Sequence, residues 1–404
     1  MTRAAGRADA PADVVVVGGG PAGAAVAIGL ARRGRTVVVF ERAPVWRWRA
    51  CGVFTSPATI PGLERLGVAS PDLALVARGV PAMRVEAASG ATFRLTYGDD
   101  GSGRAAAVGL DRSMLDPLLL DLARSAGADV RSGVAVRAVH AGTVTLADGT
   151  AVAARIVIGA DGLRSIVARE AGVARRPPLG DRAALTFHVE DPAPESPRDA
   201  RMIVFDGGYV GLAPVPGGRV NVGIVLANGM WRRRLRANGA GAVARAVMAA
   251  IPVTPDDPVP WAAPRICDEI AGAAPVGSRA TRRSGRDWLL VGDAAGFLDP
   301  FTGEGLHRAL RSAELAVTIV DRALDGDDHA LAAYDRALVG RTRAKDLVSL
   351  LVQAFLVVPP AFDYAARRLA DRAAVRETMG RVIGDLAPAS GAFDPRFLAA
   401  LLRP

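Results

Sequence analysis

The sequence predicts an α/β protein that combines a doubly wound lobe, an inserted antiparallel β-sheet and a helical C-terminal region. Three observations predict this architecture. Residues 13–17 are a β-branched apolar run that leads through a glycine triplet into an alanine-rich helix at residues 22–33. Short apolar runs separated by turn residues fill residues 183–227, and the pattern from residue 330 to the end is nearly all helical. A chain of 404 residues is also long enough for about two or three lobes.

The first predicted unit has the strand–turn–helix–strand order of a Rossmann-like fold. Residues 36–40 form a second apolar strand, which Glu41 closes. In the turn before the helix, glycine permits a tight bend and a close approach of the backbone to a pyrophosphate, while the helix N-terminus supplies unpaired N–H groups. Glu41, about 20 residues further on, can accept hydrogen bonds from a ribose. The turn residues expected at this site are Gly18, Gly20, Ala22 and Gly23.

The remaining pattern completes three regions. Residues 112–126 form an amphipathic helix, residues 155–159 and 288–291 form buried strands, and residues 305–324 form a long helix. We assign residues 12–80, 105–180 and 276–330 to the nucleotide-binding lobe, residues 81–104 and 181–275 to a substrate-binding sheet domain, and residues 331–404 to the helical region.

Two later motifs place carboxylates at strand ends. Asp161 follows a buried strand, although an Asp-Gly pair is also an ordinary turn. Asp293 follows the strand at residues 288–291, where a carboxylate can bind a polyol chain. Gly303 and Gly305 then begin a helix, so backbone donors and the positive end of the helix dipole can stabilise negative charge.

Composition weighs against several other classes of protein. The net charge is +9, but Lys345 is the only lysine and the arginines are scattered, so nucleic-acid binding is the weaker interpretation. Cys51 and Cys267 lie far apart and predict neither a metal cluster nor a disulfide framework, which fits a cytoplasmic protein. Residues 1–12 lack the apolar core of a signal peptide. The apolar run at residues 347–358 is too short to span a bilayer.

The order of the motifs GGGPAG, GADGLRS and GDAAGFLDPFTGEG resembles the superfamily of aromatic flavoprotein hydroxylases and geranylgeranyl reductases. The resemblance implies a non-covalently bound FAD, with Asp293 on its ribityl chain and the following segment beside the isoalloxazine. Arg112 resembles the family's arginine near the flavin phosphates, and the alternative is a surface arginine at a helix start. Besides the first turn and Glu41, the cofactor-binding residues expected are Arg42, Arg49, Cys51, Gly52, Arg112, Asp161, Gly292, Asp293, Pro300, Gly303, Glu304 and Gly305.

Two segments resemble the geranylgeranyl-reductase branch in particular. Cys51-Gly52 is similar to a segment whose cysteine lies near the flavin, which makes Cys51 a candidate catalytic residue; the alternative is a small buried hydrophobic side chain. The stretch from Tyr209 to Asn221-Val222-Gly223 is similar to the branch's substrate sheet, so Tyr209 and Asn221 are candidate substrate contacts. The branch's aromatic positions are here Gly211 and Ala213, which changes the expected pocket wall.

Three functions remain open on the sequence alone. The favoured one is a flavin monooxygenase that hydroxylates a lipophilic aromatic or phenolic compound, with NAD(P)H as reductant and the flavin supplying the chemistry. The alternatives are reduction of a carbon–carbon double bond in an isoprenoid or quinone tail, and a non-catalytic FAD electron carrier. The apolar stretch at residues 347–362 is a candidate lid, dimer face or membrane-surface patch, and we favour packing against the nucleotide-binding lobe.

Overall fold

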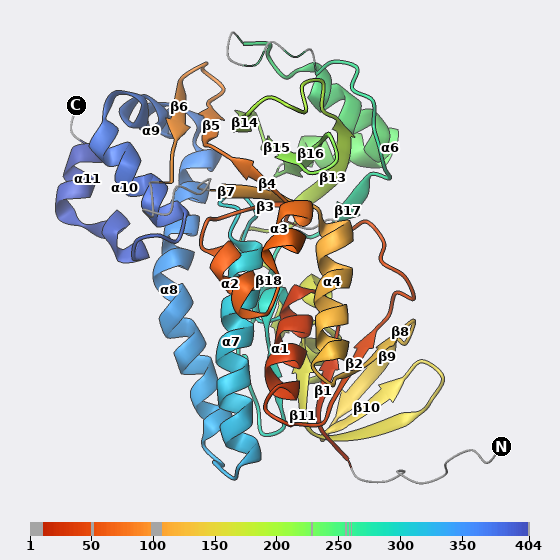
Figure 1. The fold of residues 1–404 in the computed structure, drawn as a ribbon. Helices are drawn as coiled ribbons and strands as arrows, with labels where there is room; N and C mark the ends of the chain where they lie inside the picture. Colours follow the sequence, from red (N-terminus) through yellow and green to blue (C-terminus); the bar gives the residue numbers. More distant parts are fainter. Residues whose placement is uncertain are drawn as a thin grey trace.

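The computed structural model describes residues 11–49, 52–97, 107–227, 229–254, 257, 259 and 261–402. It confirms the predicted α/β architecture. Figure 1 shows a lobe built on a twisted sheet, a second sheet lying across one end of that lobe, and a group of C-terminal helices beside both.

The first lobe is built on a seven-stranded sheet whose central strands are parallel. Its valine-rich strand β1 lies in the middle, because β-branched side chains pack well on both faces of a buried sheet. The hairpin β9–β10 extends the sheet in the antiparallel sense. The strands are β1 (Ala12–Val17), β2 (Val37–Glu41), β8 (Asp129–Ser132), β9 (Val136–His140), β10 (Thr143–Leu146), β11 (Ala151–Gly159) and β19 (Trp288–Leu290).

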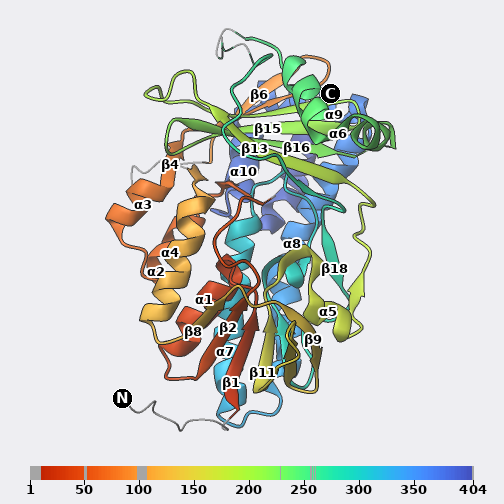
Figure 2. The same ribbon diagram turned by 90° about the vertical axis from the view of Figure 1, so that its right-hand side faces the viewer.

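Helices α1 (Pro21–Ala31), α4 (Arg112–Ser125) and α7 (Gly305–Leu324) pack beside this sheet. Helices α1 and α7 approach each other closely at Gly29, where a Cβ atom would lie 2.6 Å from Val317 Cγ2. Figure 2 shows α1, α7 and β1 stacked in this lobe below the second sheet.

The second sheet has seven strands in the order β17-β13-β16-β15-β14-β5-β6. It is antiparallel as predicted, except that β14 and β5 pair in parallel. Helix α6 (Gly229–Ala249), which the sequence analysis did not predict, covers one face with an apolar cluster of its own. The strands are β5 (Met83–Glu86), β6 (Thr92–Leu95), β13 (Ala183–Glu190), β14 (Ala200–Phe205), β15 (Gly208–Val215), β16 (Arg219–Leu226) and β17 (Ala271–Ala273).

Short elements connect the two sheets. Two three-stranded sheets have the orders β3-β7-β4 and β12-β18-β20. Their strands are β3 (Phe54–Thr55), β4 (Ala77–Val80), β7 (Ala107–Leu110), β12 (Ala174–Arg175), β18 (Ser278–Ala280) and β20 (Gly296–Phe297). The short helices are α2 (Thr59–Arg65), α3 (Ser70–Val76) and α5 (Ile166–Glu170).

The C-terminal helices are α8 (Ala330–Val357), α9 (Pro359–Asp371), α10 (Ala373–Ile383) and α11 (Pro395–Leu402). The first half of α8 packs on the nucleotide-binding lobe through Leu331 and Tyr334. Its second half keeps polar contacts with that lobe, since Asp346 and Ser349 hydrogen-bond to Arg308 and Glu304. Its apolar side chains do not join the core of the lobe, so the packing favoured for residues 347–362 is found only in part. Val348 and Phe362 instead join the apolar cluster between the second sheet and α9 to α11, because the end of α8 runs past the lobe toward the sheet (Figure 1).

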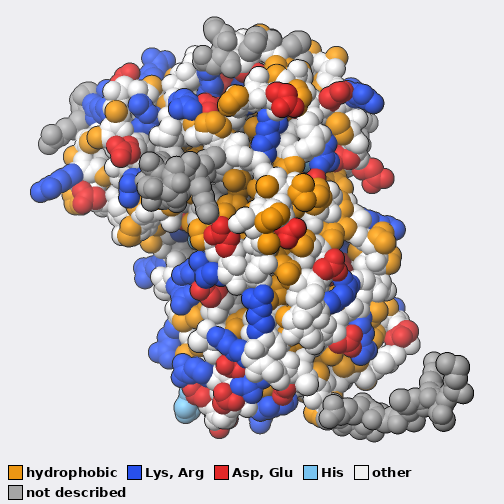
Figure 3. Space-filling model, viewed as in Figure 1, with side chains coloured by type: hydrophobic (Ala, Val, Ile, Leu, Met, Phe, Trp, Pro, Cys, Tyr) orange, Lys and Arg blue, Asp and Glu red, His pale blue; other side chains and the backbone are white. Residues whose placement is uncertain are grey.

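The distribution of surface charge and the hydropathy of the helices bear on two classes of partner, nucleic acids and membranes. On the face in Figure 3, acidic and basic side chains are interspersed. Among the described helices none is by itself long and apolar enough to cross a membrane, although α8 and α9 together meet the length and composition criteria across a bend of 116°.

Candidate active site

The glycine turn after β1 divides into glycines that the fold needs and one that faces open space. A Cβ at Gly18 would lie 2.5 Å from the Ala160 carbonyl oxygen, and one at Gly23 would lie 2.0 Å from the Gly18 carbonyl oxygen. A Cβ at Gly20 would meet nothing within 4 Å. Helix α1 begins at Pro21, and no side chain caps its N-terminus. The turn therefore leaves space and unpaired backbone donors where an anionic group would bind.

Glu41 lies buried at the end of β2, directly beside this turn. Its Oε2 accepts a hydrogen bond from the Gly19 backbone N–H at 2.8 Å, and its Oε1 accepts one from the Ala43 N–H at 3.0 Å. A carboxylate has further acceptor capacity, so these bonds leave room for a ribose hydroxyl. Arg42 is exposed and Arg49 is half-buried. The cofactor contacts expected for these three residues stay predictions.

Arg112 is buried at the first turn of α4, so the alternative of a surface arginine is wrong. Its guanidinium makes a paired contact with Asp116, at 2.6 and 3.0 Å, one turn further along the same helix. A third nitrogen, Nη1, donates to the Gly52 carbonyl at 2.8 Å. Asp116 is not among the residues predicted from the sequence, although the spacing of four residues is the signal for such a helical pair.

One carboxylate oxygen of Asp161 is used in a local hydrogen bond that follows β11. Its Oδ2 accepts a hydrogen bond of 2.6 Å from the Ile166 N–H at the start of α5. Its Oδ1 is buried and has no partner among the described residues, and burial raises the pKa of this carboxyl. The carboxylate thus fixes the turn after β11, and a cofactor contact through Oδ1 stays a prediction.

Asp293 presents a carboxylate that the described protein leaves without a hydrogen-bond donor. Gly292, with φ of +57°, lets the chain turn sharply against Ala22 at the start of α1. Burial raises the pKa of Asp293 to about 6, although the positive charges of Arg112 and Arg308 lower it. An unpaired, half-buried acceptor beside the glycine turn fits the polyol chain of FAD, which would supply the missing hydroxyl donors.

The loop at residues 299–305, which we call the flavin loop, follows the Asp293 motif and contacts the second sheet through Asp299 and Tyr209. Gly303, with φ of +67°, packs so closely that a Cβ would lie 2.7 Å from Phe54. Glu304 is buried and ties the loop to α8, because its Oε1 accepts from Ser349 Oγ at 3.1 Å and its Oε2 lies 3.6 Å from Lys345 Nζ. Pro300 and Gly305 lie in the same loop. Gly303 is therefore required for packing against Phe54, and Glu304 anchors the loop. The flavin contacts expected of Pro300, Gly303 and Gly305 stay predictions.

A buried polar network that the sequence analysis missed centres on Asp299. Its Oδ1 accepts hydrogen bonds from Tyr209 at 2.5 Å, from Gln353 at 2.8 Å and from the Phe301 N–H at 3.0 Å, while its Oδ2 accepts from Arg182 at 2.8 Å. Arg182 also donates to Gln353. The lone glutamine in an apolar stretch was the available signal. This network joins both lobes to α8 behind the flavin loop.

The two candidate substrate residues lie on the face of the second sheet away from α6. Tyr209 gives its hydroxyl to Asp299 and places its ring edge-on to Phe301 at 5.1 Å. Burial and the neighbouring Asp299 carboxylate raise its pKa. Asn221 accepts a hydrogen bond from Thr186 Oγ1 at 3.1 Å. Contacts of either residue with a substrate stay predictions, and Cys51 lies outside the described residues.

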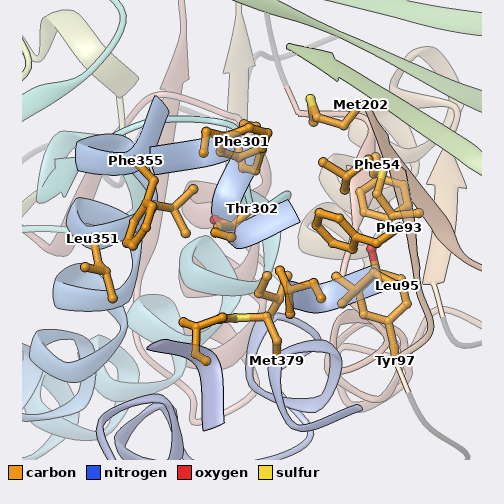
Figure 4. A pocket seen from close by; sticks show the side chains of 18 residues that line it. Phe54, Phe93, Leu95, Tyr97, Met202, Phe301, Thr302, Leu351, Phe355 and Met379 are labelled. Carbon is orange, nitrogen blue, oxygen red and sulfur yellow. The ribbon is translucent and has the colours of Figure 1, made fainter. Parts of the chain in front are cut away.

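An apolar pocket that is partly open to solvent lies between this sheet face, the flavin loop and the C-terminal helices. Figure 4 shows Met202 and Phe93 on one side and Phe355 and Leu351 on the other. Phe301 and Thr302 bring the flavin loop into the wall. Thr302 Oγ1 is buried without a partner among the described residues. The pocket thus suits a lipophilic molecule next to the expected flavin position.

Comparison with known proteins gives consistent matches over most of the chain. A family described as "FAD binding domain" matches residues 11–348. The chain is 30% identical over 335 residues to the menaquinone reductase of Mycobacterium tuberculosis (strain ATCC 25618 / H37Rv), covering 78% of this chain and 77% of that protein. It is 30% identical over 347 residues to digeranylgeranylglycerophospholipid reductase 2 of Methanopyrus kandleri, covering 78% of each.

Two solved structures have similar folds. A geranylgeranyl bacteriochlorophyll reductase-like protein from Thermoplasma acidophilum has a TM-score of 0.76 and 23% identity, covering 96% of this chain and 98% of that one. CmlS, a flavin-dependent halogenase, has a TM-score of 0.72 and 25% identity. The match covers 83% of this chain but only 63% of the halogenase.

Proposed function

Because the chain belongs to the FAD-binding-domain family and is an FAD-dependent oxidoreductase, we propose that it reduces a carbon–carbon double bond in the isoprenoid chain of a lipophilic substrate. The two relatives described above, each 30% identical to this chain, are named as reductases, one of menaquinone and one of a digeranylgeranylglycerophospholipid. Their names support reduction over the hydroxylation that the sequence analysis favoured.

The residues of the first lobe would hold FAD in a defined orientation. The space over Gly20 and the N-terminus of α1 would receive the pyrophosphate, and the Asp293 carboxylate would accept hydrogen bonds from the ribityl chain. The loop at residues 299–305 would lie beside the isoalloxazine. Bound FAD supplies two-electron chemistry, and the protein supplies position and exclusion of water. We propose NAD(P)H as the source of electrons and the cytoplasm as the location.

The apolar pocket is the observation that carries this proposal. Its wall is made of apolar and aromatic side chains from both lobes and from α8 to α11. Such a wall stabilises a hydrocarbon chain by removing it from water, at about 25 cal/mol per Å². Phe301 and Thr302 connect the pocket to the flavin loop, so a chain bound there would present its double bonds near the reduced ring.

Hydroxylation remains a second candidate because of the sheet itself. Gly211 and Ala213 stand where the resemblance to geranylgeranyl reductases implies aromatic side chains. The inner face of the sheet is consequently less filled than an isoprenoid-specific wall would be, which would admit a ring.

Single-turnover reactions without oxygen would separate the two chemistries. Photoreduced holoenzyme would be mixed with menaquinone or with a geranylgeranyl lipid under strict anaerobiosis. We expect the flavin to reoxidise and the isoprenoid chain of the product to gain two carbon-bound hydrogens, one of them deuterium when the solvent is heavy water. Menaquinone converted only to its quinol, with an unchanged chain, would contradict double-bond reduction. A flavin that stays reduced until oxygen enters, with label from dioxygen in the product, would instead establish hydroxylation.

A further inference from the structure

The two central strands of the second sheet leave one spot on the inner face uncovered. Apart from Gly208 at the strand end, Gly211 is the only residue of β15 that is not buried. Apart from Arg219 at its start, Gly223 is the only such residue of β16. Gly211 and Gly223 are direct partners in the ladder. We call this pair the glycine patch.

Nothing in the described structure fills the space over the glycine patch tightly. A Cβ at Gly211 would make only ordinary contacts, the nearest being the tip of Met202 at 3.5 Å. A Cβ at Gly223 would have only the Asn221 amide nitrogen within reach, at 4.0 Å. Met202 lines the apolar pocket, so the glycine patch adjoins the pocket along the sheet.

On the other side of the patch lies His188, a buried histidine that the flavin motifs do not use. It is 2% exposed and stands opposite Asn221 in the ladder between β13 and β16. Its Nδ1 lies 2.6 Å from Asp268 Oδ2, and its backbone N–H donates to Asp268 Oδ1 at 2.7 Å. Its Nε2 is buried and has no partner among the described residues.

The side chain of His188 is held by the Asp268 carboxylate and by the Trp48 indole. Alternation along β13 puts Leu185, Phe187 and Val189 in the cluster under α6, so Thr186 and His188 point to the inner face. The indole of Trp48 packs on the imidazole with ring centroids 4.4 Å apart. Trp48 is itself fixed by a hydrogen bond of 3.0 Å from its Nε1 to the Thr186 carbonyl.

We propose that the glycine patch and His188 form a subsite for a ring that carries a hydroxyl group, the head group of the substrate whose chain occupies the apolar pocket. This inference rests on the proposed function, because it extends the same substrate site. The flat glycine surface would receive the face of the ring, and Nε2 would accept the hydroxyl hydrogen. Two strands lie between those of Met202 and Thr186, which makes three strand spacings or about 14 Å and accommodates a head group beside the pocket.

The charge state of the His188 imidazole determines which class of ligand group its Nε2 can bind. The charged groups that act on the imidazole are Asp268, Arg219 and Asp111. Burial lowers its pKa, although Asp268 raises it, so the ring is neutral at pH 7. We assign the proton to Nδ1, which has the carboxylate as acceptor, and this makes Nε2 an acceptor. A hydroxyl group therefore matches the site, whereas a carboxylate or an ether oxygen leaves Nε2 unpaired.

The test compares matched ring compounds on the holoenzyme, with perturbation of the flavin spectrum as the binding signal. We expect 1-naphthol to bind about fivefold to tenfold more tightly than 1-methoxynaphthalene, because one hydrogen bond to a buried acceptor is worth about 1 kcal/mol. His188→Phe should abolish this preference, and His188→Gln, which keeps an acceptor, should restore part of it. Equal affinities for the two compounds in the wild-type protein would overturn the subsite without any variant.

A second variant tests the glycine patch. Gly211→Phe should weaken 1-naphthol binding at least tenfold while FAD content stays at the wild-type level, whereas Gly211→Ala should have a smaller effect. Unchanged naphthol affinity in a flavin-loaded Gly211→Phe protein would place the ring elsewhere. The subsite and the proposed function fail separately: naphthol discrimination without anaerobic reduction leaves the subsite, and anaerobic reduction without discrimination leaves the function.

Discussion

At the scale of single residues, the glycine turn separates folding from cofactor binding. Gly18 has φ of +103° and lies against Ala160, and Gly23 lies against the Gly18 carbonyl, so side chains there would disturb the fold. Gly20 has φ of −70° and open space around its Cβ position. The same motif thus contains residues that the chain needs to fold and one that only a ligand needs.

Gly20→Val should therefore fold normally and lose FAD. The valine methyl groups would occupy the space into which the pyrophosphate must come, so we expect the dissociation constant for FAD to rise tenfold or more. The free energy of unfolding of the apoprotein should change by less than about 0.5 kcal/mol. Gly340→Val in α8 is the matched control, since its Cβ also meets nothing within 4 Å. Equal FAD affinity in the two variants would show that the pyrophosphate lies elsewhere.

Asp293 should make the stability of the apoprotein depend on pH. Its pKa is about 6 in the folded protein, above the ordinary value of 3.8. The folded state binds the proton of the Asp293 carboxyl more tightly than the unfolded state does. The stability that this protonated carboxyl contributes is therefore present at low pH and is lost as the pH rises from about 4 through about 6. Asp293→Asn should raise the free energy of unfolding at pH 8, on the order of 1 kcal/mol more than at pH 5.

The same variant should bind FAD at least tenfold more weakly, because an amide replaces a charged acceptor for the polyol. Chemical denaturation at both pH values and titration with FAD would measure the two effects. A stability gain that does not change with pH, or wild-type FAD affinity, would contradict the assigned environment of the carboxylate.

At the scale of elements, α8 has two apolar faces in its second half. Leu351 and Phe355 line the apolar pocket. The outward face carries Leu347, Leu350, Ala354 and Val357, a helical spacing that we call the apolar stripe. Val357 is 69% exposed, and the exposed Arg336 and Arg343 continue the same face toward the N-terminus of the helix.

We predict from this arrangement that the apolar stripe contacts an anionic bilayer, which would deliver a lipophilic substrate next to the pocket. The holoenzyme should float with vesicles of phosphatidylcholine and phosphatidylglycerol, and less so at high salt. The double variant Leu350→Glu, Val357→Glu should lower the bound fraction at least tenfold. Leu75→Glu on α3, where Leu75 is 60% exposed, is the control. Equal flotation of the two variants, or a stable dimer that covers the stripe, would refute membrane contact.

At the scale of the whole molecule, the second sheet and the C-terminal helices complete what the first lobe begins. Asp299, at the end of the flavin motif, is held by Tyr209 from the sheet and by Gln353 from α8. Burial raises the pKa of Asp299, and Arg182 opposes this with its positive charge. The three parts thus meet at one buried polar network beside the pocket.

The sequence by itself determined the parts of this protein that depend on neighbouring residues. A tight turn needs glycine, a helix N-terminus offers unpaired N–H groups, and a buried parallel strand favours β-branched residues. All three features can be recognised within short segments such as residues 13–41. The α/β fold class and the FAD-dependent family followed from these segments. A helix within the inserted region, α6, was missed, because its apolar residues are sparse and Gly239 interrupts it.

Only the tertiary structure decided how the distant segments combine. Arg182 meets Asp299 across 117 residues and Gln353 across 171 residues. The apolar pocket is formed only when β5, β14, the flavin loop and α8 to α11 come together. His188 is a candidate binding residue only because the fold places it beside Trp48, Asp268 and the glycine patch. Such contacts depend on the packing of whole elements, whose position no local pattern encodes. The glycine turn after β1 can therefore be recognised in the sequence, whereas the candidate substrate site can be recognised only in the folded protein, where the lobes pack together.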